Sequence, residues 1–337
     1  MKLKNNQQKN KIIVNTLFSK PKKKRNSVFT FIDLFAGIGG TRMGFESVGG
    51  ECVFTSEWDN FCQKTYQANF EEIPYGDITK IKESEIPNFD ILVAGFPCQP
   101  FSSIGKRQGF LHATQGTLFY DVLRIIKHKK NKAFLLENVQ GLVTHDNGDT
   151  FKTILKSLDE IGYEVFYQIL NASNYGVPQQ RKRIYIVGFR RDLFSKKEIE
   201  FNFPAAKNKK AYINDYLEKN AKGYSISTHL QKNYLFKKND GRPIIVDKNS
   251  KTQVKTLVSS YHKIQRLTGT FVKDGETGIR LLTESECKSI MGFPQDFIIP
   301  VSRTQMYRQM GNSVVVPVIK AIAGEIVKTL KKADLIN

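Results

Sequence analysis

Cys98 lies where a nucleophile is expected, at the junction of a predicted buried strand and a tight turn. The apolar run from Asp90 to Phe96 predicts the strand, and the Pro-Cys-Gln-Pro sequence of residues 97–100 predicts the turn. Open α/β sheets carry their chemistry at the carboxyl ends of the strands, so such a turn exposes its side chain there. An isolated cysteine more often behaves as a small buried apolar residue. The prediction of a nucleophile therefore depends on the residues around Cys98.

Three charged side chains provide surroundings that suit a reactive thiol. Glu137 ends the predicted strand 133–137, at the carboxyl end where open α/β sheets place functional side chains. Gln179, Arg181 and Arg183 lead into another strand, and their alternate spacing predicts that they share one face. Nearby cations favour the thiolate form of a cysteine. The alternatives are a surface or helix-capping role for Glu137 and a phosphate-binding surface for the arginines.

A glycine-rich turn after the first predicted strand has the form of a nucleotide-binding loop. Its glycines let a ligand approach the backbone, and the start of the following helix can hold an anion. The turn lacks the phosphate-loop pattern, and Arg42 stands where a dinucleotide fingerprint has its third glycine. The residues that form it are Phe35, Ala36, Gly37, Ile38, Gly39 and Gly40.

Two acids and the only tryptophan follow this turn, at the ends of successive predicted strands. Glu57 comes 20 residues after Gly37, where a carboxylate can bind both ribose hydroxyls. Trp58 can stack on an adenine ring, and Asp77 can accept a hydrogen bond from the adenine amino group. Either acid alone is typical of a solvated surface, but the three residues together predict an adenosine pocket.

The positive charge of the chain is concentrated in two segments. The formal net charge is +20; residues 1–25 hold nine Lys or Arg and no acid, and residues 191–279 hold 18 Lys or Arg against nine Asp or Glu. A nearly neutral body with two basic segments predicts a polyanionic partner, although a basic tail and a solubilising surface would have the same composition.

Four scattered cysteines disfavour a disulfide framework and a zinc site and fit a reducing cytosol. Neither a secretory signal nor an apolar run of membrane-spanning length is apparent.

Strand-like and helix-like segments alternate from residue 28 to residue 190, which predicts a doubly wound α/β domain with a mainly parallel sheet. Helices are expected over 41–48, 59–70, 118–130 and 150–161. Residues 191–279 break this rhythm and contain only short β-like pieces, at 243–246 and 256–261. A capping-box sequence at Thr283–Glu286 starts another helix, and a last helical stretch covers 314–332, where Pro317 interrupts the pattern early.

Six motifs occur in a fixed order along the chain: Asp33–Gly40, Gly95–Ser102, Glu137–Val139, Gln179–Arg183, Arg280–Glu286 and Gln305–Val314. Together they resemble the motif set of the cytosine-5 DNA methyltransferases. The resemblance covers about residues 28–190 and 279–325, and the body is particularly similar to bacterial restriction-modification methylases such as the one that acts on CCGG. It implies the doubly wound, Rossmann-like fold of S-adenosylmethionine-dependent methyltransferases, with a second, smaller target recognition domain. The target sequence does not transfer, because specificity lies in the variable module.

The resemblance also implies a reaction and a cofactor. Cys98 adds to carbon 6 of a cytosine that has left the duplex, Glu137 engages the ring nitrogen, and S-adenosylmethionine supplies the methyl group for carbon 5. Arg181 and Arg183 hold the cytosine carbonyl oxygen and orient Glu137. The base that accepts the carbon-5 proton is not identified by the motifs. Besides the glycine-rich turn, the residues expected to contact the cofactor are Glu57, Trp58, Asp77, Ile78, Pro97, Leu118, Asn312 and Ser313.

DNA contacts are expected in a mobile lid and in the recognition domain. The lid covers residues 99–118, a loop rich in Gly, Ser and Lys that closes when the target base leaves the duplex. Gln115 replaces an arginine that the family commonly has before the following helix, which puts one phosphate contact in doubt. Gln and Arg side chains suit adenine and guanine edges, respectively. The residues expected to contact DNA are Gln99, Ser102, Lys106, Arg107, Gln179, Gln253, Thr256, Leu257 and Arg266.

The sequence thus predicts a flexible basic arm at 1–27, a catalytic and cofactor-binding domain at 28–190, a DNA target recognition domain at 191–279 and a C-terminal return to the catalytic domain at 280–337. The expected partners are double-stranded DNA and, by resemblance, a restriction endonuclease of shared specificity. The expected protein is a cytoplasmic bacterial monomer that needs no metal and no membrane.

Three alternatives remain open. A tRNA cytosine methylase shares the motifs, but the 89-residue basic module favours duplex DNA. A catalytically idle DNA-binding protein is disfavoured by the intact Cys98, Glu137, Arg181 and Arg183. A nicotinamide dehydrogenase is disfavoured by Arg42.

Overall fold

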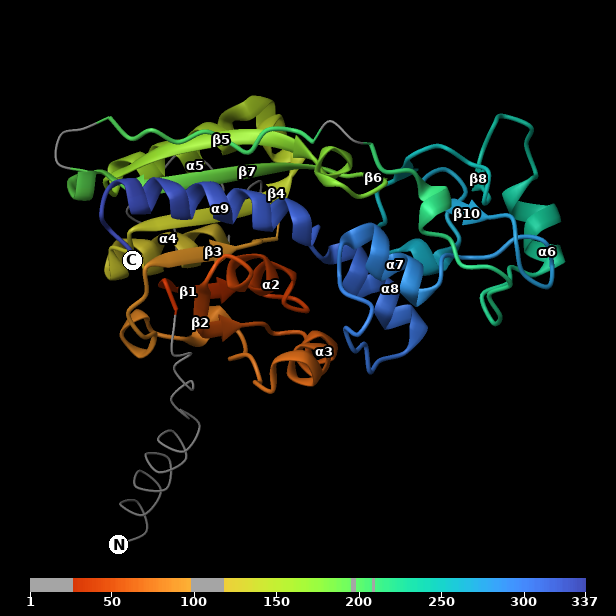
Figure 1. Cartoon of the computed structure of the whole chain (residues 1–337), viewed down its shortest axis with the longest axis horizontal. Helices are drawn as coiled ribbons and strands as arrows, with labels where there is room; N and C mark the ends of the chain where they lie inside the picture. The colour runs from red at the N-terminus through yellow and green to blue at the C-terminus, as the bar shows by residue number, and fades with distance from the viewer. Residues whose placement is uncertain (1–26, 98–117, 195–197, 208–209) are drawn as a thin grey trace, which may run out of the picture.

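The computed structural model describes residues 27–97, 118–194, 198–207 and 210–337. Its central feature is a six-stranded sheet with the order β2-β1-β3-β4-β7-β5 (Figure 1). Strands β1 to β4 are parallel, and β7 is antiparallel to both of its neighbours. The predicted doubly wound, mainly parallel sheet is therefore confirmed. The strands are β1 (Phe29–Leu34), β2 (Gly50–Ser56), β3 (Ile91–Ala94), β4 (Ala133–Val139), β5 (Tyr163–Asn171) and β7 (Lys182–Arg190).

The direction of strand order reverses at β1. From β1 the sheet continues to β2 on one side and to β3 and β4 on the other. Ligands of open α/β sheets bind at such a switch point, outside the carboxyl ends of the strands. The glycine-rich turn after β1 and the turn after β3 both begin there.

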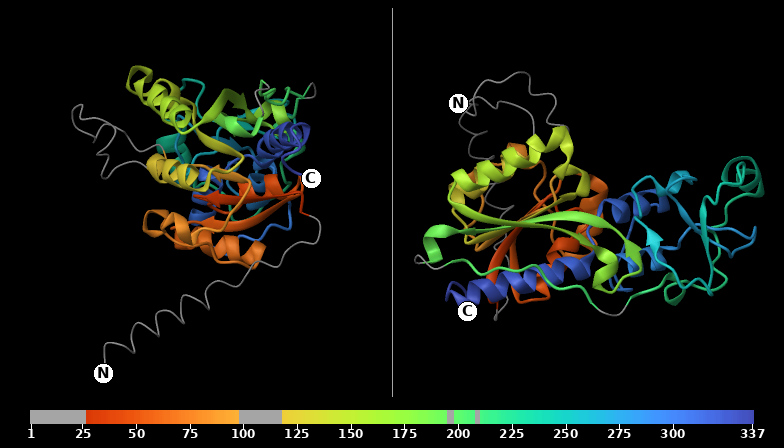
Figure 2. Two further views of the ribbon diagram at one scale, coloured as in Figure 1. Left: turned by 90° about the vertical axis from the view of Figure 1, so that its left-hand side faces the viewer. Right: turned by 90° about the horizontal axis from the view of Figure 1, so that it is seen from above.

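Helices cover both faces of the sheet (Figure 2). Helices α4 (Leu118–Lys129) and α5 (Asp149–Glu160) pack on one face, and α2 (Gly40–Glu46) and α9 (Val316–Lys332) pack on the other. Successive strand residues point to opposite faces, so Leu92 packs with α4 and α5 whereas Val93 packs on the side of α2 and α9. Burial on both faces explains why β3 is apolar throughout. The remaining helix of this part is α3 (Asn60–Phe70).

A second part of the molecule extends beyond the carboxyl ends of the central sheet (Figure 1). It contains two small parallel sheets, β6 (Gln179–Gln180) with β9 (Val254–Lys255) and β8 (Ile244–Val246) with β10 (Thr270–Val272). A short helix α6 (Thr228–Leu230) continues into a π-helical turn, Gln231–Leu235. Helices α7 (Glu284–Met291) and α8 (Arg303–Asn312) lie between this part and the central sheet. In the described ranges, no helix is long and apolar enough to cross a membrane.

Three local expectations are corrected by the structure. Pro317 does not interrupt the last helix, because it occupies the first turn of α9, where a missing N–H costs nothing. Residues 256–261 are not a strand, since β9 precedes them and a 3₁₀ turn follows at Tyr261–Lys263. Residues 198–207 lie against the central sheet, where the ring of Phe201 is 5.4 Å from those of Phe166 and Phe189. The predicted capping box before α7 is present.

The packing of α9 against α2 returns the end of the chain to the helix that follows β1. A Cβ atom on Gly44 of α2 would lie 2.8 Å from Cβ of Ile319 and 3.1 Å from the backbone nitrogen of Lys320. A glycine is therefore required for the two helices to approach this closely.

Replacing Gly44 by alanine should destabilise the fold. Overpacking costs about 1–3 kcal/mol, which exceeds the gain of up to ~1 kcal/mol in helix propensity. Gly324→Ala in α9 is the matched control, because open space surrounds that position, and it should be neutral or stabilising. Urea unfolding followed by circular dichroism measures both. Equal stability of the two variants would contradict the close packing.

Candidate functional site

A cavity of about 440 Å³ lies at the carboxyl ends of the strands around the switch point, and we call it the central cavity. It is formed by the turns after β1, β2 and β3, the end of β4, the start of β7 and the end of α8. The structure thereby brings together many of the residues that the sequence singles out. Those that line it are Phe35, Ala36, Gly37, Ile38, Gly40, Glu57, Trp58, Pro97, Glu137, Arg181, Arg183, Asn312 and Ser313.

The glycine-rich turn reaches the cavity with backbone rather than with side chains. Gly37 and Gly39 have φ angles of 56° and 87°, in the left-handed region that favours glycine. A Cβ atom on Gly39 would come within 2.2 Å of the ring of Phe70, so Gly39 is needed for packing and does not line the cavity. A Cβ atom on Gly40 would lie 3.0 Å from Oγ of Ser313, which brings the segment after α8 directly over the turn.

Glu57 and Trp58 form one wall of the cavity. The Glu57 carboxylate accepts hydrogen bonds of 2.8 Å from the N–H groups of Gly37 and Asp59, and burial raises its pKa. Each carboxylate oxygen has a further lone pair, so the group can still accept hydrogen bonds from a ligand. The indole of Trp58 is 76% exposed and is thus available for stacking.

Glu137 and Arg183 form an ion pair at the opposite wall. Arg183 Nε lies 3.1 Å from Glu137 Oε1, and both side chains are largely buried. Burial raises the pKa of Glu137, while the positive charges of Arg183 and Arg181 oppose that rise. Asn138 donates a 2.9 Å hydrogen bond to the carbonyl of Phe96, which joins the end of β4 to the residue before Pro97. The pair is therefore held next to Phe96 and Pro97, which precede Cys98 in the sequence.

Arg181 joins three segments of the chain. Its terminal nitrogens donate to the carbonyls of Leu257 (3.0 Å), Gly311 (3.0 Å) and Ser313 (2.6 Å). Burial, together with the positive charge of Arg183, lowers the pKa of Arg181 to about 10, so it remains a cation at neutral pH. Its Nε atom is buried and has no hydrogen-bond partner among the described residues. Arg181 thus connects the second part of the molecule to the end of α8, and it also lines the cavity.

The expected shared strand face of Gln179, Arg181 and Arg183 is not observed. Gln179 belongs to β6, which pairs with β9, whereas Arg183 belongs to β7 in the central sheet. Arg181 lies between the two strands and belongs to neither. Because the chain is not a continuous strand from Gln179 to Arg183, the two arginines have different partners: Arg181 binds main-chain carbonyls and Arg183 binds Glu137.

The residues expected to contact DNA from the second part are mostly engaged inside the protein. Gln179 is fully buried; its amide accepts from the Leu257 N–H at 2.8 Å and donates to the Ile290 carbonyl at 3.1 Å. Thr256 donates to the carbonyl of Gln180, and the Gln253 side chain accepts from that of Gln180. The buried Leu257 and Arg266 also have internal partners. In this structure Gln179 and Arg266 therefore differ from the exposed base-contacting residues that we expected.

Other predicted residues lie apart from the central cavity or cannot be placed. Asp77 caps a short 3₁₀ helix by accepting from the Thr79 N–H, and Ile78 is buried behind it. Neither of them, nor Leu118 at the start of α4, lines the cavity. The basic arm up to residue 26 lies outside the described residues. So do Cys98, Gln99, Ser102, Lys106, Arg107 and Gln115.

The sequence analysis missed several residues that line the cavity. Gln309 is the most informative, because it donates to the carbonyl of Phe61 (2.8 Å) and accepts from Thr65 (3.0 Å), and so fixes α8 on α3. It stands inside the Gln305–Val314 motif, so the motif could have indicated it. A second cavity of about 390 Å³ shares four lining residues with the first. The missed lining residues of the central cavity are Thr41, Asp59, Cys62, Gly95, Phe96, Asn138, Val139, Gln309, Gly311 and Val314.

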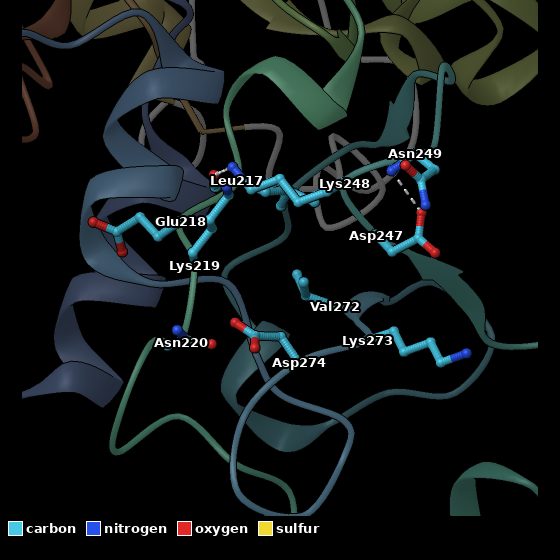
Figure 3. A pocket seen from close by; sticks show the side chains of 10 residues that line it. All are labelled: Leu217, Glu218, Lys219, Asn220, Asp247, Lys248, Asn249, Val272, Lys273 and Asp274. Carbon is cyan, nitrogen blue, oxygen red and sulfur yellow. Dashed lines mark hydrogen bonds between the residues drawn. The ribbon is translucent and has the colours of Figure 1, made fainter.

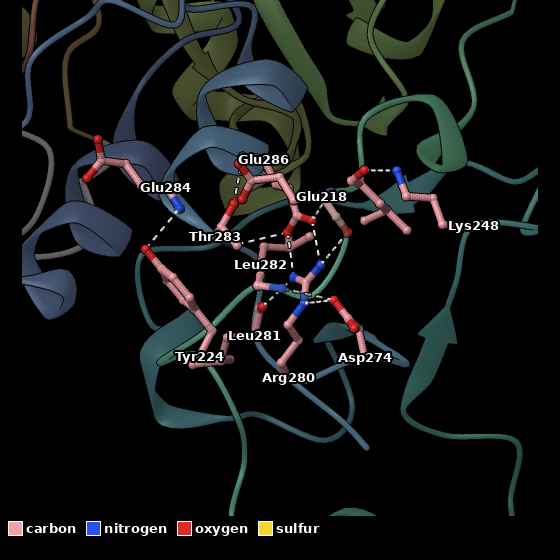
Figure 4. A network of polar contacts seen from close by, with 12 residues as sticks. Glu218, Tyr224, Lys248, Asp274, Arg280, Leu281, Leu282, Thr283, Glu284 and Glu286 are labelled. Carbon is pink, nitrogen blue, oxygen red and sulfur yellow. Dashed lines mark hydrogen bonds and ion pairs between the residues drawn. The ribbon is translucent and has the colours of Figure 1, made fainter. Parts of the chain in front are cut away.

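A buried ion network stabilises the second part (Figure 4). The fully buried Arg280 donates to both oxygens of Glu286 at 2.8 Å and to Asp274 at 2.9 Å. Glu286 also accepts from the Thr283 and Glu218 N–H groups, each at 2.8 Å. The network therefore fixes the start of α7 against the chain around Glu218. The capping-box pattern predicts the contact with Thr283 but not the one with Arg280.

A third cavity, of about 270 Å³, lies within the second part (Figure 3). Three lysines and three acids line it, and three of these groups are already engaged: Asp274 binds Arg280, Lys248 donates to the carbonyl of Leu217, and Asp247 accepts from the Asn249 N–H. No residue that the sequence analysis singled out lines it.

Comparisons with known proteins show similarity to DNA methylases. The family model for C-5 cytosine-specific DNA methylases matches residues 29–328. The chain is 59% identical to the type II methyltransferase M.MspI of a Moraxella species over 309 residues, which cover 92% of this chain and 73% of the relative. It is also 59% identical to the type II methyltransferase M.BsuFI of Bacillus subtilis over 315 residues, which cover 93% and 76% of the two chains.

Two solved structures share the fold. A mutant of Spodoptera frugiperda DNMT2 superposes with a TM-score of 0.72 at 24% identity and covers 90% of this chain and 99% of that one. A structure of a putative DNA modification methyltransferase of an Escherichia coli prophage has a TM-score of 0.63 at 19% identity, with the same coverage. At these identities the likeness shows the fold alone.

Asp33 is a buried carboxyl group directly beneath the site. It lies in β1, two residues before the glycine-rich turn, and is fully buried. Burial raises its pKa from 3.8 to about 8, although the positive charge of Arg42 opposes the rise. Between these two values the folded chain holds a proton that the unfolded chain has lost.

Asp33 should therefore make the fold less stable as the pH rises. Relative to Asp33→Asn, the wild type should lose up to about 1.4 kcal/mol of unfolding free energy per pH unit between about pH 4 and pH 8. Urea unfolding of both proteins at several pH values in this window measures the difference. A difference that does not change with pH would show that Asp33 is ionised in the folded state.

Proposed function

Because this chain belongs to the C-5 cytosine-specific DNA methylase family, we propose that its central cavity methylates carbon 5 of a cytosine flipped out of duplex DNA. The observation that carries the proposal is the composition of one cavity. Glu57 and Trp58, which suit an adenosine group, face the same space as the Glu137–Arg183 pair, which suits a cytosine. A cofactor and a flipped base can thus meet there.

The residues present fit S-adenosylmethionine as the cofactor. Glu57 can accept from ribose hydroxyls, Trp58 offers an exposed ring to adenine, and the open space beside Gly37 leaves room for the rest of the molecule. Pro97, Asn312 and Ser313 would complete the enclosure. The cofactor would supply a methyl group activated by a sulfonium centre. Asp77 and Ile78, which do not line the cavity, would act on the cofactor only through the wall that they support.

The side chains of the protein would make carbon 5 reactive in three ways. The Cys98 thiolate would bond to carbon 6 of the ring. Glu137, whose pKa is raised by burial, would donate a proton toward ring nitrogen 3, so that the electrons of the attacked double bond become available at carbon 5. Arg183 would orient Glu137, and the guanidinium of Arg181, which lines the cavity, would help to hold the cytosine carbonyl oxygen. Loss of the carbon-5 proton and elimination of Cys98 would then release the methylated base.

The proposal also includes the domain organisation of the chain, its DNA substrate and its biological role. We propose the domains predicted from the sequence, with an arm, a catalytic domain and a recognition domain; the ring contacts of Phe201 support assigning residues 198–207 to the catalytic domain. Duplex DNA would be held between the two domains, with the lid residues Ser102, Lys106 and Arg107 on phosphates. The type II relatives support a role in a bacterial restriction-modification system, together with an endonuclease of shared specificity and a location in the cytoplasm.

Replacing the proposed nucleophile should abolish methylation. Plasmid DNA and tRNA are incubated separately with S-adenosylmethionine labelled on its methyl group. The wild type should label only the DNA, Cys98→Ala should label neither, and Glu137→Gln should be slower by roughly 10²–10⁴-fold. Cys52→Ala is the matched control, because burial raises the pKa of that thiol to about 12 and keeps it unreactive.

Two results would overturn the proposal. Labelling of tRNA alone would identify an RNA methylase, and labelling of DNA by Cys98→Ala would exclude the thiol as the nucleophile. Bisulfite sequencing of the labelled plasmid would then give the target sequence.

Trp58 should report directly on the cofactor. It is the only tryptophan in the chain, so its fluorescence should change when S-adenosylmethionine binds. Trp58→Ala should weaken binding roughly 10- to 100-fold in calorimetry, because an aromatic ring stacked on a base contributes about 1–3 kcal/mol. Phe61→Ala, which removes an exposed ring outside the central cavity, should bind normally. If Trp58→Ala bound S-adenosylmethionine as tightly as the wild type, the adenine ring would not stack on Trp58.

A further inference from the structure

Arg266 fixes a neighbouring segment of the second part instead of facing outward. It is 8% exposed, and its Nε donates to the carbonyl of Leu235 at 2.9 Å. Its terminal nitrogens donate to the carbonyl of Lys238 at 2.9 Å and to both carboxylate oxygens of Asp240. All its partners lie within residues 235–240. Arg266 therefore holds that segment against the turn that contains Arg266 itself.

This turn and this segment present three exposed apolar side chains, which we call the apolar ridge: Tyr234, Phe236 and Leu267. They are 44%, 46% and 55% exposed, respectively. Tyr234 and Phe236 flank Leu235, and Leu267 follows Arg266, so the 2.9 Å contact between Arg266 and Leu235 joins the two segments that carry these side chains. The Gly269 N–H donates to the Gln265 carbonyl at 2.8 Å and closes the turn. The ridge is thus carried by two segments whose backbones are fixed to each other.

Positive charge is concentrated in the sequence around the ridge residues. Residues 230–242 contain four Lys or Arg and a single acid, Asp240, whose carboxylate is already paired with Arg266. On the other side of the ridge, Lys255 donates to the carbonyl of Leu267 at 3.0 Å. An exposed apolar surface with a cationic border suits a polyanion that also offers flat apolar edges. Duplex DNA has that combination in its major groove.

The helix that leads to the ridge and one helix-covered face of the central sheet lie on the same side of the molecule. Helix α6, which leads into the π-helical turn before Tyr234, lies at the far end of the second part. In the right-hand view of Figure 2, α6 and α5 lie on the same side of the molecule. A single partner can therefore touch both parts from that side.

We propose that the apolar ridge contacts base edges in the target duplex and contributes to sequence specificity, and that Arg266 is the positioning residue that holds the ridge in shape. The inference rests on the proposed function, since it requires a DNA substrate. It replaces the direct base contact that we expected from Arg266.

The experiment compares duplexes for each variant of the full-length protein. Bisulfite sequencing of plasmid DNA methylated by the wild type first defines the target. Then kcat/KM is measured on an oligonucleotide duplex with that target and on duplexes with one base pair changed. The readout is kcat/KM on the target duplex divided by kcat/KM on each changed duplex. A loss of protein stability lowers both values and leaves this ratio unchanged.

Phe236→Ala and Leu267→Ala should reduce this ratio roughly tenfold or more at one base pair, since each base contact contributes discrimination of about that size. Arg266→Lys should reduce it at the same base pair, because lysine cannot reach all the partners of the guanidinium. The matched controls are Ile73→Ala and Tyr167→Ala, which remove exposed side chains from the catalytic part and should keep the wild-type ratio. The ridge residues are exposed, so their truncation leaves the core intact.

The outcomes separate the inference from the proposed function. A wild type that methylates no DNA would overturn the proposed function and, with it, the inference. A wild type that methylates one sequence, with ridge variants that retain its ratio within twofold, would overturn the inference alone. Equal losses in the control variants would also overturn it, because the effect would then not belong to the ridge.

Discussion

The site depends on one electrostatic constraint: a buried guanidinium must be surrounded by acceptors, since an unpaired charge in the interior costs several kcal/mol. Arg181 meets this constraint with carbonyl groups that lie 76 to 132 residues further along the chain. The two segments that provide them belong to the second part of the molecule and to the end of α8. The charge that faces the cavity can therefore be buried only when both segments are in place. Folding of the catalytic wall and docking of the second part are coupled for this reason.

Burial and nearby positive charge have opposite effects on Glu137, in the wall of the cavity that also contains Arg183. Burial favours the neutral form of Glu137, and the two arginines favour the ionised form. A carboxyl group between these influences can hold a proton and yet release it when negative charge develops on a bound base. The same arginines would favour a thiolate nearby. One pair of cations can thus serve both the acid and the nucleophile of the proposed reaction.

The fold and the cofactor wall are largely predictable from the sequence, because strand ends and glycine positions are local signals. Phe35 to Gly40, Glu57 and Trp58 fall where the spacing places them. The errors occur where the outcome depends on tertiary partners. Arg266 and Gln179 have the right chemistry for base contacts, but carbonyls and amides from distant segments occupy their side chains. Pro317 breaks an apolar pattern in the sequence, yet its position in a first turn makes it compatible with the helix.

The three acceptors of Arg181 are all main-chain carbonyls, which every residue carries. Side chains at these positions and around them can therefore be exchanged during evolution while the connection between the two parts stays the same. If the second part selects the target sequence, as the proposed function implies, it can diverge under selection for new targets without a compensating change in the wall that contains Glu137 and Arg181. A single fold can in this way give rise to many enzymes that share one chemistry and differ in the DNA that they select.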